Sequence, residues 1–306
     1  MSRITVTLVA LLLFPFALFS QKHIERGYRT ILSADAQIFV ETLASDSLQG
    51  RGAGEEGDRM AAEYIVSLLE QWSIKPFSDG GYLQPFTVNG CAMSNILAVI
   101  PGKSNEYVVV GAHYDHLGFG MAIDGDSCYN GADDNASGVS AVLQIARAVK
   151  TMRKTPERGI IFAFWDGEEK GLLGSRHFVE NCAFLSQVSA YINFDMIGRG
   201  PVDNPKHVTY FYTASHPAFG DWLKEDMELR GFSFVPDYRA WENPTGGSDN
   251  AWFAKNGIPI VWYHTEGHPD YHQVGDSADK VDYRKLTDIS RAACLCVWRL
   301  ANVRNY

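Results

Sequence analysis

Residues 107–118 read YVVVGAHYDHLG, an apolar run that ends at a histidine and continues at once into polar residues. Consecutive β-branched residues, without alternation between apolar and polar positions, are typical of a strand that is buried on both faces. Such strands occur in parallel sheets that helices cover on both sides. The stretch therefore predicts an α/β protein in which His113 lies at the carboxyl end of an inner strand.

The same pattern recurs on either side of this stretch. Further strands are expected at residues 94–101, 159–165, 190–196, 208–213 and 258–263. Helical spacing of apolar residues occurs at residues 34–48, 57–72, 138–150, 171–179, 218–230 and 283–302. Strands that alternate with helices predict a three-layer α/β sandwich with a mixed, mostly parallel central sheet flanked by helices. The glycine-rich segment 50–57, GRGAGEEG, is expected to be a flexible break between the first two helices.

The N-terminal segment has the pattern of an export signal. Arg3 precedes an apolar stretch at residues 4–19, and a small residue, Ser20, follows it. This run is short for a membrane span, so we expect a signal peptide at residues 1–20, with an uncleaved anchor as the alternative. The remaining 286 residues, 21–306, are expected to form a single domain, exported to the periplasm or the extracellular space.

The composition argues against two classes of binding partner. The formal net charge is −9 and no cluster of lysine and arginine occurs, which argues against binding to nucleic acid or to an anionic membrane surface. We expect a soluble monomer that has no membrane contact after the signal peptide is removed. Of the five cysteines, Cys294 and Cys296 lie in an apolar segment and are expected in the core. The sequence does not determine whether Cys91 or Cys128 forms a disulfide.

Metal-ligand side chains follow three of the predicted strands. His113 ends one strand, the pair Glu168–Glu169 follows another, and Asp195 lies at the end of a third. Ligands of open α/β sheets bind outside the carboxyl ends of the strands, so these side chains should meet at one edge. Imidazole and carboxylate groups are ligands of zinc. An isolated carboxylate such as Asp195 in an apolar strand also needs a cation or strong donors.

The two adjacent glutamates are expected to have different roles. Two neighbouring carboxylates repel each other, and a cation would relieve that repulsion. One of them would bind metal while the other, unmetallated, takes a proton from zinc-bound water. The alternative is a solvated start of a helix, where acids are favoured by the helix dipole.

Two further motifs contain candidate metal ligands, but residue chemistry alone does not show which of these residues bind metal. GADDNASG, residues 131–138, offers Asp133 and Asp134 as hard oxygen ligands, although an N-cap turn would use the same residues. DYHQVGDS, residues 270–277, offers a histidine, and the three candidates in this region are His264, His268 and His272. Asp115 lies two residues after His113 on the same face of an extended segment, where it can fix the imidazole tautomer. His116 is expected at the rim.

These motifs together resemble those of a known family. The phrases AHYDHLG, GADDNASG, DGEEKGLLGS, NFDMIG and YHQVGDS occur in the order found in the two-zinc exopeptidases, which include bacterial leucyl aminopeptidases, glutamate carboxypeptidase II and glutaminyl cyclases. The similarity runs from about Leu43 to the C-terminus and is greatest to secreted bacterial aminopeptidases.

The resemblance implies roles for individual residues. Two Zn²⁺ ions per chain would be held by His113, Asp134, Glu169, Asp195 and His272. Asp134 would bridge the two ions and be followed by a cis peptide bond to Asn135. Asp115 would orient His113, and Glu168 would be the general base and then the acid that protonates the departing amine. One departure is Asn250, where many relatives carry histidine. The resemblance therefore does not determine the residues of the substrate pocket.

The implied activity is that of an aminopeptidase. It would hydrolyse N-terminal residues from peptides with a free N-terminus, through a zinc-bridging water that Glu168 activates. The alternatives are a glutaminyl-peptide cyclotransferase with one zinc and a non-catalytic binding domain of the same fold. Neither GxSxG nor HExxH occurs, which disfavours serine chemistry and a second class of zinc protease. Five aromatic residues could line an apolar pocket or belong to the core: Tyr238, Trp241, Trp252, Phe253 and Tyr263.

Overall fold

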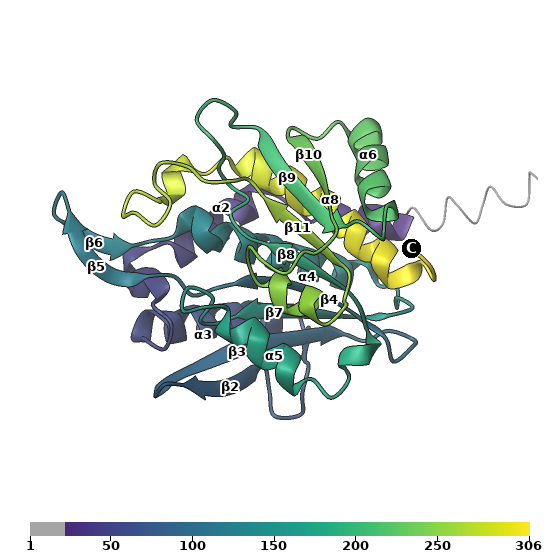
Figure 1. Ribbon diagram of the computed structural model, residues 1–306, viewed down its shortest axis with the longest axis horizontal. Coiled ribbons are helices and arrows are strands. Elements are labelled where there is room, and N and C mark those ends of the chain that lie inside the picture. Colours follow the sequence, from purple (N-terminus) through teal and green to yellow (C-terminus); the bar gives the residue numbers. More distant parts are fainter. Residues whose placement is uncertain (1–21) are drawn as a thin grey trace, which may run out of the picture.

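The computed structural model describes residues 22–306 (Figure 1). The predicted signal peptide, residues 1–20, lies outside the described residues. Within the described range, no helix has both the length and the apolar character that a membrane crossing requires.

A large mixed sheet forms the middle layer of the protein (Figure 1). Its strands are β1 (Lys75–Pro76), β2 (Leu83–Val88), β3 (Cys91–Ile100), β4 (Tyr107–His113), β7 (Gly159–Trp165), β8 (Val188–Phe194), β9 (His207–Thr213), β10 (Val235–Trp241) and β11 (Ile260–His264). The spatial order is β1-β3-β7-β4-β8-β11-β9-β10, with β2 also paired to β3. The central strands β7, β4, β8 and β11 run parallel, and antiparallel pairs join them to β3 and β9. The predicted three-layer α/β sandwich is confirmed.

Helices cover both faces of the sheet. One outer layer contains α2 (Ser33–Leu43), α3 (Glu56–Gln71), α4 (Gly138–Met152), α6 (Ala218–Arg230) and α8 (Tyr283–Asn302). The opposite layer contains α5 (Leu173–Asn181) and α7 (Asn250–Lys255), which pack against the sheet through Phe178 and Phe253. Strands in the middle are therefore buried on both faces, which explains their apolar sequences.

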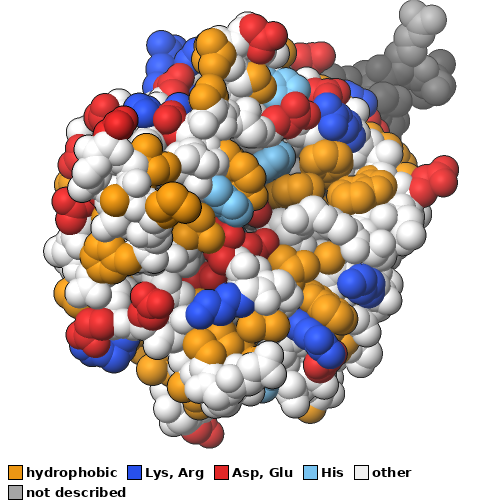
Figure 2. All heavy atoms as spheres, turned by 60° about the vertical axis from the view of Figure 1, so that its left-hand side comes forward, with side chains coloured by type: hydrophobic (Ala, Val, Ile, Leu, Met, Phe, Trp, Pro, Cys, Tyr) orange, Lys and Arg blue, Asp and Glu red, His pale blue; other side chains and the backbone are white. Residues whose placement is uncertain are grey.

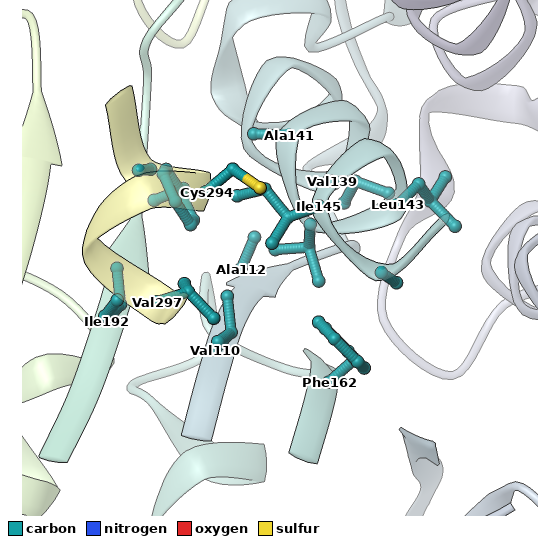
Figure 3. Packing of buried hydrophobic residues seen from close by; sticks show 14 of the residues in the cluster. Val110, Ala112, Val139, Ala141, Leu143, Ile145, Phe162, Ile192, Cys294 and Val297 are labelled. Carbon is teal, nitrogen blue, oxygen red and sulfur yellow. The ribbon is translucent and has the colours of Figure 1, made fainter. Parts of the chain in front are cut away.

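The main core lies between the parallel strands and helices α4 and α8 (Figure 3). Val110 of β4 and Phe162 of β7 face Ile145 of α4 and Val297 of α8, and none of these four side chains is exposed. Cys294 and Cys296 are buried, as predicted. All five cysteines carry free thiols, so Cys91 and Cys128 form no disulfide.

Segment 50–57 is not the flexible break that its glycines suggest. Its first two residues belong to a short helical turn, η1 (Asp46–Arg51), in which Arg51 is fully buried. The Arg51 guanidinium donates hydrogen bonds to the backbone carbonyls of Leu43, Tyr114, Asn130 and Gly131. A buried guanidinium with several acceptors fixes the loops that supply them.

Several elements of the described residues, among them an edge strand, a short helix and a hairpin, are not predicted by apolar runs. The edge strand β10, sequence VPDYRAW, carries polar residues because it pairs with β9 alone. Helix α7 is only six residues long. The hairpin of β5 (Gly118–Ile123) and β6 (Asp126–Tyr129) projects from the body of the protein (Figure 1) and exposes most of β5. Sequence periodicity is weak in segments that bury little surface.

Candidate metal centre

The sheet brings the predicted strand-end residues to one edge. His113 ends β4, Glu168 and Glu169 follow β7, and Asp195 directly follows β8. These three strands are parallel neighbours, so their carboxyl ends lie side by side. Histidine and acidic side chains gather at a hollow on this face of the molecule (Figure 2).

One half of the centre is formed around His113. Its Nε2 lies 3.3 Å from Oδ1 of Asp134 and 3.6 Å from Oδ1 of Asp195. The three ligand atoms lie within 4.8 Å of one another, and all three residues are buried. We call His113 and Asp195 the strand half, because the sheet positions both.

The other half is formed around His272, which comes from the loop between β11 and α8. Its Nε2 lies 3.1 Å from Oδ2 of Asp134 and 3.1 Å from Oε2 of Glu169. Asp134 thus turns one oxygen towards His113 and the other towards His272. We call Glu169 and His272 the loop half. The peptide bond between Asp134 and Asn135 is cis.

The neighbouring histidines and the neighbouring aspartate lie in other environments. The Nδ1 of His264 is 2.7 Å from the backbone carbonyl of Asp195. The Nε2 of His268 is 3.3 Å from Oδ2 of Asp133, beneath the centre. Oδ1 of Asp133 accepts hydrogen bonds from the backbone N–H groups of Gly198 and Arg199. Among these alternatives, Asp134 contacts a histidine of each half, and His272 contacts Asp134 and Glu169.

Asp115 holds the loop that carries the glutamates. Its Oδ1 accepts a hydrogen bond of 3.0 Å from the N–H of Glu168, and its Oδ2 accepts one of 3.3 Å from the N–H of Glu169. The carboxylate lies 3.7 Å from Nδ1 of His113, whereas the Asp115 backbone carbonyl lies at 3.2 Å from the same atom. Asp115 therefore contacts both His113 and the two glutamates, and the nearer contact to His113 is through the backbone.

The electrostatics of the centre favour cations. Burial raises the pKa of Glu168 well above its usual value; His113 opposes the shift, while Asp195 and Asp249 add to it. Burial alone would raise the pKa of Asp134 too, but hydrogen bonds from His113 and His272 outweigh it and hold this pKa well below its usual value. Carboxylates this crowded repel one another, and a bound cation offsets that repulsion. Imidazole nitrogens and carboxylate oxygens in one cluster fit zinc.

Sequence reasoning missed two residues at the centre. His116 is buried rather than at the rim, and its Nδ1 lies 2.8 Å from Oε1 of Glu169. Asp249 is fully buried, and burial raises its pKa to about 7. Asn250, the departure from the family pattern, donates hydrogen bonds to the carbonyls of Pro244 and Gly246 and so braces a loop beside the pocket.

A pocket of about 220 Å³ opens over the candidate centre, and Met196, Trp262 and Tyr271 form its apolar wall beside Glu168. The aromatic residues considered from sequence do not line it: Tyr238, Trp241, Trp252, Phe253 and Tyr263. A larger cavity of about 760 Å³ lies between α3 and strands β2 and β3, but no imidazole lines it. The chemistry of the side chains therefore favours the smaller pocket as the candidate site.

Comparison with known proteins finds one matching peptidase family and several curated relatives. The model of the family described as Peptidase family M28 matches residues 95–297. Leupeptin-inactivating enzyme 1 of Streptomyces exfoliatus is 29% identical over 284 residues, which cover 85% of this chain and 59% of that protein. An aminopeptidase of Pseudomonas aeruginosa is 36% identical over 121 residues, 39% of this chain and 20% of that protein. The chain thus spans less than two thirds of the length of these two curated relatives.

Solved structures share the fold. The LapA aminopeptidase of Legionella pneumophila has a TM-score of 0.74 at 23% identity and covers 92% of this chain and 75% of that chain. BSAP, a zinc aminopeptidase from Bacillus subtilis, has a TM-score of 0.72 at 17% identity, with 90% and 97% covered. The glutaminyl cyclase of Porphyromonas gingivalis has a TM-score of 0.66 at 19% identity, with 87% and 98% covered. At these identities the likeness concerns the fold.

Proposed function

The chain belongs to peptidase family M28, and on that basis we propose that it is a zinc-dependent aminopeptidase, which hydrolyses the bond after the N-terminal residue of a peptide. The observation that carries the proposal is the position of Asp134. Its two oxygens face imidazoles of opposite halves, 3.3 Å from His113 and 3.1 Å from His272. A carboxylate placed in this way is suited to bridge two cations.

The five residues that the resemblance implies would hold two zinc ions. His113 and Asp195 would hold one, Glu169 and His272 the other, and Asp134 would be shared. Zinc, when bound, polarises a carbonyl group and lowers the pKa of a bound water to about 7. Two ions are favoured over one because each half offers its own imidazole and its own carboxylate.

Glu168 would act as the general base. Its side chain lines the pocket, and the hydrogen bond from its N–H to Asp115 fixes the backbone that carries it. Burial and the nearby acids Asp195 and Asp249 raise its pKa well above the usual value, which makes the carboxylate a stronger proton acceptor. Glu168 would take the proton of the attacking water and deliver it to the departing amine.

The pocket favours removal of a single terminal residue. Its volume of about 220 Å³ is smaller than the roughly 300–1,000 Å³ of sites for drug-sized ligands. Met196, Trp262 and Tyr271 would contact an apolar side chain, while the acids at its base would attract the free amine. We therefore propose peptides with a free N-terminus and an apolar first residue as substrates.

Cyclisation of N-terminal glutamine is the second candidate, because a glutaminyl cyclase shares the fold. The two reactions give different products from the same peptide. Hydrolysis releases a free amino acid and a shortened peptide, whereas cyclisation releases ammonia and keeps every residue.

A peptide library read by mass spectrometry would test the proposal. We expect sequential loss of N-terminal residues, no cleavage of peptides whose amine is acetylated, and loss of activity on chelation that zinc restores. Conversion of N-terminal glutamine without loss of a residue would support the cyclase instead. Turnover that persists after zinc has been removed would refute both.

We also propose that the protein is exported as a single catalytic domain, residues 21–306, which acts as a monomer. The basis for export is the apolar segment at residues 4–19, which the small residue Ser20 follows. Edman sequencing of protein from the periplasm or medium should give Gln21 as the first residue. A mature chain that still begins at Met1 would contradict export by cleavage.

A further inference from the structure

His116 occupies a position in the centre that neither strand periodicity nor the family ligand set assigns. Its side chain is fully buried, and Nδ1 lies 2.8 Å from Oε1 of Glu169 and 3.8 Å from Oδ2 of Asp134. These three ligand atoms lie within 4.8 Å of one another. The ring also contacts the ring of His272, with 5.9 Å between centroids.

The surrounding chain fixes the imidazole in this place. The backbone N–H of His116 donates a hydrogen bond of 2.9 Å to the carbonyl of Arg51, the residue whose buried side chain fixes four other carbonyls. Gly131 has a φ of 58°, and a Cβ there would lie 2.5 Å from Cδ2 of His116. The glycine therefore leaves the space that the His116 ring fills.

The distances fit a tetrahedral zinc site. Zinc forms bonds of about 2.0–2.2 Å to nitrogen and oxygen, so the ligand atoms of a tetrahedral ion lie about 3.3 Å apart. In the loop half, the measured separations are 2.8 Å and 3.8 Å from His116 Nδ1 to Glu169 and Asp134. His272 Nε2 lies 3.1 Å from the same oxygen of Asp134, Oδ2, and 3.1 Å from the other oxygen of Glu169, Oε2.

We propose that Nδ1 of His116 is a fourth protein ligand of the metal in the loop half, beside Asp134, Glu169 and His272. This inference rests on the proposed function, because it requires a metal there. The loop half then has the closed, four-ligand set of a structural zinc site, whereas the strand half has three ligands, His113, Asp134 and Asp195, and keeps a position for substrate. The ion in the loop half should accordingly bind more tightly than the ion in the strand half.

Metal binding to apo-protein tests this without reference to activity. Wild type, His116→Gln and His177→Gln would be titrated with zinc against a competing chelator, with metal content read by mass spectrometry. His177 is the matched control, because its ring stacks on Phe86 of β2, outside the centre. We expect two sites in wild type and in the control, and in His116→Gln a loss of more than about 100-fold in affinity at the tighter site. Circular dichroism would verify that each variant folds.

A spectroscopic measurement separates a ligand from a residue that only donates a hydrogen bond to Glu169. In protein with ¹⁵N-labelled histidine and bound ¹¹³Cd, we expect one-bond coupling at three imidazoles, including Nδ1 of His116. Coupling at His113 and His272 alone, or unchanged affinity in His116→Gln, would overturn the inference while leaving the two-metal proposal intact. Failure of wild type to bind any metal would instead overturn the proposed function, and this inference with it.

Discussion

The two halves of the centre are built in different ways. In the strand half, His113 ends a central strand and its side chain is 1% exposed. In the loop half, the His272 side chain is 36% exposed, and its backbone has a φ of 56° in a loop between β11 and α8. The pairing of β4 with two neighbours fixes the first position, whereas the second depends on contacts of the loop itself.

Polar contacts attach this loop to the rest of the centre. The carboxylate of Asp276 accepts hydrogen bonds from the backbone N–H groups of Asp133 and Asp134. Asp270 pairs with Arg199 at 2.7 Å and with Lys280 at 3.0 Å. The loop that carries His272 is thus tied directly to the residue that both halves share, and weakening these ties should affect the two halves unequally.

Removing the shared ligand should have the largest effect. In Asp134→Ala, His113 and His272 both lose their contact with the Asp134 carboxylate, and each half keeps only one imidazole and one carboxylate, so we expect neither half to retain metal. Activity should fall by more than the roughly 10⁴-fold that loss of a general base alone can cost. Metal content would be measured beside turnover. If the variant still holds two zinc ions, Asp134 is not the bridge between the halves.

Removing the general base, Glu168, should leave zinc bound in both halves. In Glu168→Gln, the amide cannot accept the proton, and we expect turnover to fall about 10²–10⁴-fold. The amide keeps the size of the side chain, and Asp115 still accepts the backbone N–H of residue 168. Zinc content should therefore equal that of wild type. Unchanged turnover would refute the role of Glu168 as base.

Weakening the hydrogen bonds of Asp276, which attach the His272 loop to Asp133 and Asp134, should lower metal affinity in one half more than in the other. In Asp276→Asn, one carboxylate oxygen becomes an NH2 group, which cannot accept a hydrogen bond, so an uncharged side chain with a single acceptor oxygen faces the N–H groups of Asp133 and Asp134. We expect affinity at one of the two sites, that of His272, to fall about 10–100-fold, the scale for outer contacts of metal ligands. Equal losses at both sites in a zinc titration would show that the halves are coupled rather than separate.

Weakening the ion pairs of Asp270 at the outer side of this loop should have the smallest effect on metal affinity. Asp270 is partly exposed, and exposed ion pairs contribute only about 0.2–1 kcal/mol each. In Asp270→Asn we expect the affinity at the His272 site to fall by no more than about 5-fold for each of the two ion pairs lost, since 1.4 kcal/mol corresponds to tenfold. This loss should shrink further in high salt. A larger loss would place the main anchor of the loop at Asp270 instead of Asp276.

The contrast between the halves also explains what could be predicted from the sequence. An apolar run such as YVVVGAH predicts a buried strand, and the strand-end rule then places His113 and Asp195 at one edge. No comparable rule chooses among His264, His268 and His272, because a loop follows its own tertiary contacts. Their separation before the structure rested on the family resemblance alone.

His116 was misplaced for a physical reason. In an extended segment residues at i and i+2 share a face, so His116, three residues after His113, would point away from it. The strand ends at His113, and the carbonyls of Tyr114 and Arg51 take part in hydrogen bonds that hold the following turn. The turn directs His116 back towards Glu169. Hydrophobic periodicity contains no information about such a turn.

The most direct test of the account is the zinc requirement of the reaction. Apo-protein would be titrated with zinc while the release of the N-terminal residue from a peptide is measured in the same samples. We predict that zinc-free protein is inactive and that activity reaches its full value at two zinc ions per chain. Full peptidase activity in zinc-free protein, or a plateau at one zinc ion per chain, would contradict a two-zinc aminopeptidase.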